Sequence, residues 1–224
     1  MRAALIGLGM VSHTFADAFA NSSKVSLNKV YARSAAGRAA FLAAYPELNA
    51  AEAMSADEIA ADPDIDFVIV TTPPNARAEI VATLAAAGKP ILMEKPVERT
   101  LAAARSIVET CEAAGVPLGI VFQHRVRPGV AELRAAMPGL GPLMAVESNI
   151  PWWRRQSYYD EPGRGTYERD GGGVLLTQAI HPLELMLSFT GPVTEVIAMS
   201  TTTALHRMEA EDFVSGGLRF ANGA

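Results

Sequence analysis

Near the start of the chain, a short apolar run at residues 3–6 stands directly before the glycine pair of Gly7-Leu8-Gly9. The spacing follows the pattern G-x-G-x-x-G, with Ser12 at the position of the third glycine. A buried strand that turns through glycines into a helix is typical of the first unit of a dinucleotide-binding domain. The helix N-terminus there offers backbone N–H groups and a positive dipole end to an anion. A glycine turn that binds nothing is the alternative. In the binding interpretation, the residues that contact the cofactor here are Gly7, Gly9, Met10 and Val11.

The segments that follow alternate between apolar runs and helical patterns with short connections. Strands are predicted at residues 3–6, 27–32, 66–71, 91–93 and 117–122, and helices at residues 11–21, 35–45, 75–87 and 101–114. This alternation predicts an α/β fold whose doubly wound parallel sheet forms a Rossmann domain.

The composition of the sequence changes near residue 122, where an aromatic stretch follows the alanine-rich predicted helices. Strands at 143–150 and 193–204, with a helix at 173–189 between them, predict an α+β domain with an open, mainly antiparallel sheet. Pro182 is expected to kink that helix. We therefore predict two domains, residues 1–122, which bind NAD(P), and residues 123–224, whose substrate-binding and oligomerisation role is implied only by the family resemblance given below.

The last residues alternate like a strand at 212–220 and then give a hairpin signal, Ala221-Asn222-Gly223, with no partner strand after it. Either the chain is a fragment or its sheet ends on an exposed edge, which proteins usually avoid. We expect a fragment with a truncated second sheet.

Composition excludes several classes of partner. The chain has 224 residues, 19 Lys+Arg and 24 Asp+Glu, and a net charge of −5, which does not supply the basic surface that nucleic-acid binding requires. No apolar run reaches the roughly 18 residues of a membrane span. Cys111 is the single cysteine, so an internal disulfide is impossible and a cytoplasmic protein is expected. No metal site is expected.

The end of the second predicted strand carries Arg33 and Ser34 where an NAD-selective site would place a carboxylate. An arginine pairs with a 2′-phosphate and stacks on adenine. Arg33, Ser34 and Arg38 therefore favour NADP over NAD, with surface arginines of no special role as the alternative.

Two further motifs follow predicted strands, and a third opens a helix. Thr-Pro-Pro-Asn at 72–75 and Glu-Lys-Pro at 94–96 stand at strand C-terminal ends, where ligands bind in open α/β sheets. Three glycines at 171–173 open the segment in which Thr177 and His181, four residues apart, share a helix face. Taken alone, Glu94-Lys95 is better interpreted as a solvated pair before a turn, and a lone helical histidine such as His181 is more often a structural residue.

In this order, the motifs resemble the Gfo/Idh/MocA oxidoreductases, the family of glucose–fructose oxidoreductase and inositol dehydrogenase. Gln123-His124-Arg125 and the stretch from Trp153-Arg154 to Tyr158-Tyr159 add to the resemblance, which runs along essentially the whole chain. It implies a Rossmann domain joined to an α/β domain whose open sheet forms an oligomer interface. It also implies hydride transfer between NAD(P) and a secondary alcohol or ketone of a sugar, cyclitol or sugar nucleotide, in a homo-oligomer if the second sheet is complete.

By the resemblance, Lys95 binds the reacting hydroxyl and assists proton transfer, and the Lys95–Pro96 bond is cis. His181 takes the hydroxyl proton, a task suited to an imidazole that is mostly neutral near pH 7. The remaining cofactor contacts implied are Thr72, Pro73, Asn75, Glu94 and Lys95. The substrate contacts implied are Lys95, Arg125, Arg154, Arg155, Tyr158, Thr177 and His181, with ordinary loop packing as the alternative for the aromatic stretch, Tyr159 included.

Three departures from the family pattern qualify this prediction. Thr177 stands where many members have Asp, His124 where they have Asn, and Arg77 where a His is frequent. A threonine hydroxyl cannot stabilise an imidazolium by charge, so His181 is expected to be a weaker base. The alternative function is a cofactor-binding regulator or inactive member without turnover, or a non-functional fragment.

Overall fold

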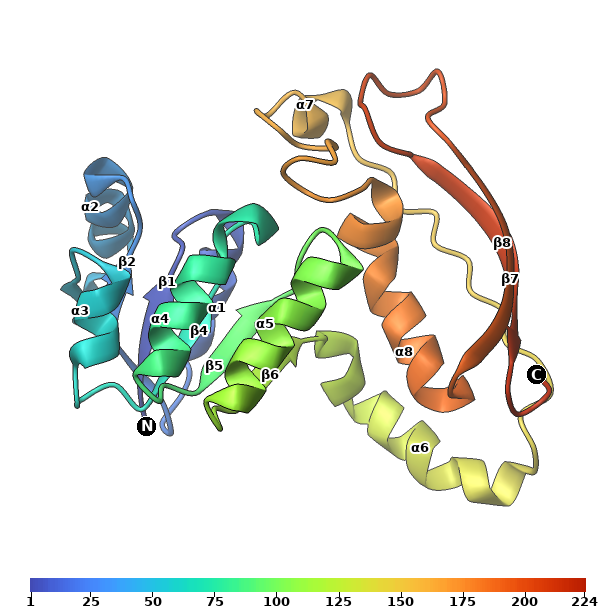
Figure 1. Ribbon diagram of the computed structural model, residues 1–224, viewed down its shortest axis with the longest axis horizontal. Helices are drawn as coiled ribbons and strands as arrows, with labels where there is room; N and C mark the ends of the chain where they lie inside the picture. The colour runs from blue at the N-terminus through green and yellow to red at the C-terminus, as the bar shows by residue number, and fades with distance from the viewer. The chain divides into compact units, whose positions relative to one another are not determined.

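The computed structural model describes residues 1–224 and divides them into two compact units, Met1–Val121 and Phe122–Ala224. The first unit is a six-stranded parallel sheet in the order β3-β2-β1-β4-β5-β6 with helices on both faces (Figure 1). Its strands are β1 (Arg2–Ile6), β2 (Ser26–Tyr31), β3 (Ala51–Glu52), β4 (Phe67–Val70), β5 (Ile91–Glu94) and β6 (Leu118–Val121). Its helices are α1 (Met10–Ala20), α2 (Ala35–Ala44), α3 (Ala56–Ala61), α4 (Ala78–Ala86) and α5 (Leu101–Ala113), with the 3₁₀ turns η1 (Pro46–Leu48) and η2 (Pro74–Ala76). The predicted doubly wound sheet is confirmed; β3 and α3 were not predicted.

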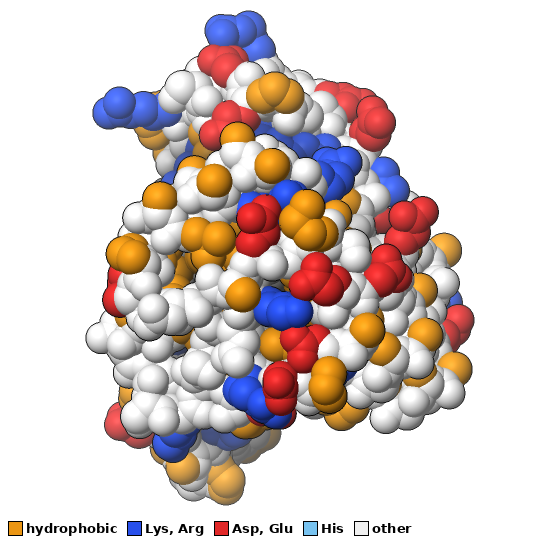
Figure 2. Space-filling model, turned by 90° about the vertical axis from the view of Figure 1, so that its left-hand side faces the viewer, with side chains coloured by type: hydrophobic (Ala, Val, Ile, Leu, Met, Phe, Trp, Pro, Cys, Tyr) orange, Lys and Arg blue, Asp and Glu red, His pale blue; other side chains and the backbone are white.

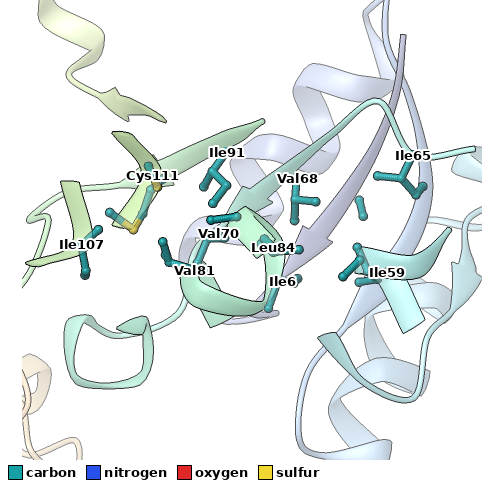
Figure 3. Close-up of a cluster of buried hydrophobic side chains, with 14 of the residues drawn as sticks. Ile6, Ile59, Ile65, Val68, Val70, Val81, Leu84, Ile91, Ile107 and Cys111 are labelled. Carbon is teal, nitrogen blue, oxygen red and sulfur yellow. The ribbon is translucent and has the colours of Figure 1, made fainter. Parts of the chain in front are cut away.

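Alternate residues of the central strand enter two separate cores. Ala3 and Leu5 of β1 face α1 and α2, in a cluster that includes Phe19 and Phe41. Ala4 and Ile6 face α3, α4 and α5, in a cluster drawn in Figure 3. The side chains of this second cluster include Ile59, Val70, Val81, Leu84, Ile107 and Cys111. Burial on both faces explains why β1 and β4 read as continuous apolar runs. It also holds the C-terminal ends of β1, β4 and β5 side by side at one edge.

The second unit has η3 (Gln123–Val126), α6 (Pro128–Leu140), α7 (Gln156–Tyr159), the π-helical turn η4 (Leu175–Ala179), α8 (Ile180–Thr190) and the strands β7 (Val193–Thr201) and β8 (Phe213–Phe220). β7 and β8 form an antiparallel pair. The strand predicted at 143–150 is wrong, because these residues have no regular structure and are mostly exposed. It begins with four consecutive apolar residues, 143–146, but no neighbouring strand pairs with its backbone, and a strand forms only where its N–H and C=O groups are paired.

The predicted helix at 173–189 is interrupted rather than kinked. The π-helical turn η4 precedes α8, and Pro182 lies in the first turn of α8. Proline lacks an N–H, so the carbonyl of Gln178, four residues earlier, loses its usual helical donor. A π-turn beside a proline is a common way for a helix to absorb that loss.

The surface carries charge of both signs. On the face in Figure 2, basic and acidic side chains are interspersed among apolar ones. None of the helices is both long and apolar enough to cross a bilayer.

Candidate functional site

The turn after β1 is shaped by two glycines with different constraints. Gly7 has φ +99°, and a Cβ added there would lie 2.7 Å from the backbone nitrogen of Thr72, so no side chain fits. Gly9 is the N-cap residue of α1 with no side-chain cap, and a Cβ at Gly9 would meet nothing within 4 Å. Ser12 donates its hydroxyl to the Gly9 carbonyl at 2.6 Å.

The N-terminus of α1 can therefore receive an anion. Its first turn contains no acidic residue, and the first N–H groups of a helix have no partner within the helix. Met10 and Val11 are exposed at 58% and 42%. A pyrophosphate would meet backbone N–H groups and the positive dipole end here, with open space at Gly9 to approach. The residues present thus fit a dinucleotide.

The arginines after β2 have separate roles. Arg33 is exposed, while Ser34 caps α2 by accepting from the Gly37 N–H at 3.1 Å. Arg38 is 5% exposed; it pairs with Glu52 and donates to the carbonyls of Ala32 and Arg33. The guanidinium of Arg38 is thus hydrogen-bonded to acceptors within the protein. The prediction that Arg38 assists phosphate binding is not supported, and Arg33 is the exposed cation at this strand end.

The ends of β4 and β5 bring the Thr72 and Lys95 segments to the same edge as the glycine turn. Thr71 donates its hydroxyl to the Gly7 carbonyl at 2.5 Å, and the buried hydroxyl oxygen of Thr72 has no hydrogen-bond partner. A buried hydroxyl without a partner is unusual and is explained by a missing ligand. Pro73 and Asn75 are exposed beside it.

Glu94 is the last residue of β5 and Lys95 follows it directly, and both residues are partly buried. The Lys95–Pro96 bond is cis, as predicted. Burial raises the pKa of Glu94, and the charges of Lys95 and Arg77 oppose that rise. The Glu94 carboxylate also accepts from the Lys95 N–H at 3.2 Å.

Arg77 belongs to this edge and was not predicted as a site residue. It is 2% exposed and donates to backbone carbonyls of the Thr72 and Lys95 segments. The sequence marked it only as a departure from the family's histidine.

In the second unit, His181 lies at the start of α8 and is 6% exposed. Its ring packs against His124, with ring centroids 5.3 Å apart, and edge-on to Phe122 at 6.3 Å. Burial and the charge of Arg127 lower the pKa of His124. The structure thus brings His124 to the predicted base.

Two other predicted residues, Thr177 and Arg125, make contacts on the helical segment that carries His181. Thr177 donates its hydroxyl to the Gly173 carbonyl at 2.7 Å, so that hydrogen is directed along the helix. Arg125 pairs with Glu184 of α8. Arg125 is therefore tied to the element that carries His181.

Gly173, the last of the three glycines at 171–173, admits this chain's own backbone. A Cβ at Gly173 would lie 1.7 Å from the carbonyl oxygen of Glu211. The Glu211 carboxylate accepts from the N–H groups of Gly173 at 3.0 Å and Leu175 at 3.1 Å, and its carbonyl accepts from Val174 at 2.9 Å. Glu211 thus caps the helical segment that carries His181, a role that sequence spacing did not indicate.

The predicted substrate residues of the aromatic stretch form a stacked cluster. Arg154 lies over the rings of Trp152 at 4.8 Å and Tyr158 at 5.3 Å, and Arg164 lies over Tyr158 at 4.3 Å. The Arg164 guanidinium also donates to the Tyr158 hydroxyl at 2.8 Å. Arg155 is exposed. Such cation–π contacts hold Arg154 and Tyr158 in place.

His206 and Asp212 form a buried pair beside this cluster, with side chains 6% and 2% exposed. The ring nitrogens of His206 face only acceptors: Nδ1 lies 2.8 Å from the Asp212 carboxylate and Nε2 lies 2.8 Å from the Arg154 carbonyl. Burial favours the neutral ring, but these two bonds outweigh it and raise the pKa of His206. Burial would also raise the pKa of Asp212, but bonds from Thr203 and His206 lower it.

We expect the pair to make the stability of the second unit depend on pH. The raised pKa of His206 stabilises the fold fully below its unfolded value near 6.5, and this contribution is lost as pH rises through the folded pKa. The lowered pKa of Asp212 adds stability above about 3.8, lost as pH falls through its folded pKa. Thermal melts of wild type and His206→Gln from pH 5 to 9 should differ most at the acidic end. A difference independent of pH would contradict the charged pair.

Comparison with known proteins covers both units. Residues 1–122 match the family described as "Oxidoreductase family, NAD-binding Rossmann fold", and residues 136–224 match the "GFO/IDH/MocA C-terminal domain". The chain is 32% identical over 212 residues to the rhizopine catabolism protein MocA of Rhizobium meliloti, covering 90% of this chain and 62% of that protein. It is 30% identical over 180 residues to the 1,5-anhydro-D-fructose reductase of Ensifer adhaerens, covering 75% and 51%.

A solved structure extends this similarity to three dimensions. The WlbA dehydrogenase of Bordetella pertussis, crystallised with NADH and UDP-GlcNAcA, matches with TM-score 0.90 and 30% identity over 100% of this chain and 67% of that one. The chain therefore spans about half to two thirds of the length of these relatives.

Proposed function

The chain belongs to the Gfo/Idh/MocA family of oxidoreductases, and from that membership we propose that it transfers a hydride between NAD(P) and a secondary alcohol or ketone of a sugar-like substrate. The observation that carries the proposal is the cofactor edge of the first unit. The open space at Gly9, the N-terminus of α1 and the buried, unpartnered hydroxyl of Thr72 meet at the ends of β1 and β4. Sugars, cyclitols and sugar nucleotides are the proposed substrates, in line with the sugar-linked names of the relatives.

The chain's residues divide the work as follows. The bound nicotinamide supplies the hydride chemistry. Lys95 donates a hydrogen bond to the reacting oxygen and keeps it in place. His181 accepts the hydroxyl proton during oxidation and returns it during reduction. Lys95 belongs to the first unit and His181 to the second.

The first test of this function is cofactor binding. Titration of the purified chain with NADPH and NADH, followed by nicotinamide fluorescence, should give saturable binding. A panel of sugars and cyclitols with bound NADP⁺ or NAD⁺ should then produce the reduced cofactor. Binding of neither cofactor would overturn the proposal.

We propose NADP as the preferred cofactor because Arg33 is exposed and no carboxylate stands at that strand end. Arg33→Glu is expected to weaken NADPH binding by about tenfold or more, since a charge-assisted pair becomes a repulsion. NADH binding should change much less. Arg105→Glu, the same charge change at an exposed position of α5, is the control. A wild-type chain that binds NADH more tightly would overturn the NADP preference and leave the dehydrogenase proposal intact.

A regulator that binds the cofactor without turnover is the second candidate. Thr177 favours it, because its hydroxyl hydrogen is directed to the Gly173 carbonyl and it carries no charge for His181. Under the dehydrogenase proposal, Thr177→Asp should instead strengthen turnover, because a carboxylate can stabilise the imidazolium of His181 by charge. Tight cofactor binding with no reduction by any substrate, in wild type and Thr177→Asp alike, would favour the regulator.

We also propose that the chain works as a homo-oligomer in the cytoplasm. The antiparallel pair β7–β8 exposes Ile197 and Met199 on one face at 81% and 64%, a surface suited to contact with another copy. The single cysteine, Cys111, is buried and requires no oxidising compartment.

A further inference from the structure

Arg77 is among the largest fully buried side chains of the chain, with 2% exposure. It stands at the N-cap of α4, directly after η2. Its guanidinium donates to three backbone carbonyl oxygens rather than to a carboxylate. Nε and Nη2 donate to Thr72 at 2.9 and 2.8 Å, and Nη1 donates to Glu94 and Pro96.

A charge in this position is expensive for the fold. Burial lowers the pKa of Arg77 to about 10, and the charges of Glu94 and Glu98 oppose that fall. The guanidinium is therefore still charged at neutral pH. Because a buried charge is unfavourable unless it is well paired, an apolar side chain would fill the same space more simply. The presence of a charged guanidinium at this buried position is explained by the backbone segments that its hydrogen bonds hold together.

Those bonds join the ends of two adjacent parallel strands. The β4–β5 ladder ends in the pairs Ile69↔Leu92 and Val70↔Met93, so the residues that follow in the two strands are not paired with each other. The carbonyls of Glu94 and Pro96 lie on either side of Lys95, and the same Nη1 binds both. The other side of the guanidinium binds the carbonyl of Thr72.

We propose that Arg77 is a positioning residue of the oxidoreductase site: it fixes the backbone of Lys95 against the Thr72 end of β4. Arg77 thereby sets the distance between the Lys95 side chain and the nicotinamide edge of the cofactor site. The effect on catalysis rests on the proposed function. The effect on the Lys95 backbone rests only on the contacts described above.

The number of donors explains why arginine is needed for this arrangement. A guanidinium has five N–H donors spread over three nitrogens of a rigid planar fork, whereas a histidine ring has at most two donors and a lysine ammonium carries its three donors on a single nitrogen. Histidine therefore has too few donors, and a single ammonium nitrogen cannot occupy the places of both Nη1 and the Nε–Nη2 side of the fork. The family's frequent histidine would therefore hold fewer of these contacts, and in this chain the Lys95 segment depends on the fork.

The test compares Arg77→Met and Arg77→Lys with a matched control, Lys89→Met. Lys89 also donates to backbone carbonyls, those of Asp62 at 2.5 Å and Ile65 at 2.9 Å, but at the opposite end of β5. The readouts are thermal stability, NADPH and NADH affinity, kcat and KM, and the backbone amide NMR signals of protein labelled with ¹⁵N-lysine. The chain has four lysines, at 24, 29, 89 and 95, so the spectrum is simple to assign.

Arg77→Met is expected to move or broaden the Lys95 amide signal while those of Lys24 and Lys29 stay in place. Its kcat should fall by about 100-fold with cofactor affinity within about threefold, because a displacement of about 1 Å at a reacting group has that effect. Arg77→Lys should recover little. In Arg77→Ala, guanidinium ion at a non-denaturing concentration should raise kcat. Lys89→Met should lower stability and leave kcat and the Lys95 signal unchanged.

Failure of this inference differs from failure of the proposed function. A Lys95 signal that stays in place in both Arg77→Met and Arg77→Lys would overturn the positioning role, whatever the activity. If the signal moves while kcat falls no more than in Lys89→Met, the catalytic consequence is wrong. If wild type turns over no substrate, the proposed function fails, and the amide signals still decide whether Arg77 fixes the Lys95 backbone.

Discussion

Gly7→Ala is expected to abolish detectable cofactor binding and to destabilise the first unit by more than about 2 kcal/mol. Two effects add at this position. The backbone has φ +99°, which an alanine adopts only with strain, and the new Cβ would lie 2.7 Å from the Thr72 nitrogen. The turn and the Thr72 strand end must separate to make room, and both belong to the cofactor edge. Chemical denaturation and NADPH fluorescence titration measure the two losses.

Two other glycines separate these effects. Gly88 has φ +71° with nothing within 4 Å of an added Cβ, so Gly88→Ala should cost about 1 kcal/mol from strain alone and leave binding unchanged. Gly9 has an ordinary φ and open space, so Gly9→Ala should cost about 0.5 kcal/mol yet weaken cofactor binding at least about tenfold by filling the phosphate approach. Unimpaired binding by Gly7→Ala would contradict the cofactor site described.

Lys95→Ala and His181→Ala should each lower kcat by about 10³-fold, within the range that general acid–base groups contribute. Cofactor affinity should change by no more than about threefold, because neither loss alters the glycine turn or the N-terminus of α1. Steady-state kinetics on a substrate found in the sugar panel, with parallel fluorescence titrations, separates the two quantities. The pH dependence of kcat/KM should lose one limb in His181→Ala.

Lys24→Ala serves as the control, because Lys24 is an exposed lysine of the same unit. It should retain wild-type kcat and affinity. Turnover near the wild-type level in both Lys95→Ala and His181→Ala would show that the proton is handled by other groups, and the assignment of both residues would be wrong.

The first unit could be predicted closely because its signals are local. Residues 3–6, the glycine turn and the helix after it are each specified by a few neighbouring residues, and two buried faces repeat that pattern along the sheet. The strand expected at 143–150 depends instead on a partner strand distant in sequence, and a short apolar run does not by itself reveal whether one is present. Strands at 193–204 and 212–220 were predicted from their local sequence, but their antiparallel pairing with each other was not predicted.

The candidate site shows the same difference between residues with a local sequence signal and residues whose partners are distant in sequence. Glycine spacing pointed to Gly7 and Gly9, and the Lys95 and His181 motifs were found through the family resemblance. Arg38 was expected to help Arg33 and Ser34 bind the phosphate of NADP, but its partners, Glu52 and two carbonyls, could not be read from its position. The acceptors of Arg77 are likewise backbone oxygens, which no residue type reveals.

The cap on the His181 helix has a consequence for the order of events during synthesis. Gly173 and Glu211 are separated by 38 positions, so the first turn of that helix leaves the ribosome before its cap exists. At about 5–20 residues per second, the delay is roughly 2–8 s. Until then the N–H groups of Gly173, Val174 and Leu175 are hydrated, and the helix end frays. The segment that carries His181 therefore reaches its final form only when the β7–β8 connection has emerged, although the helix itself is synthesised earlier.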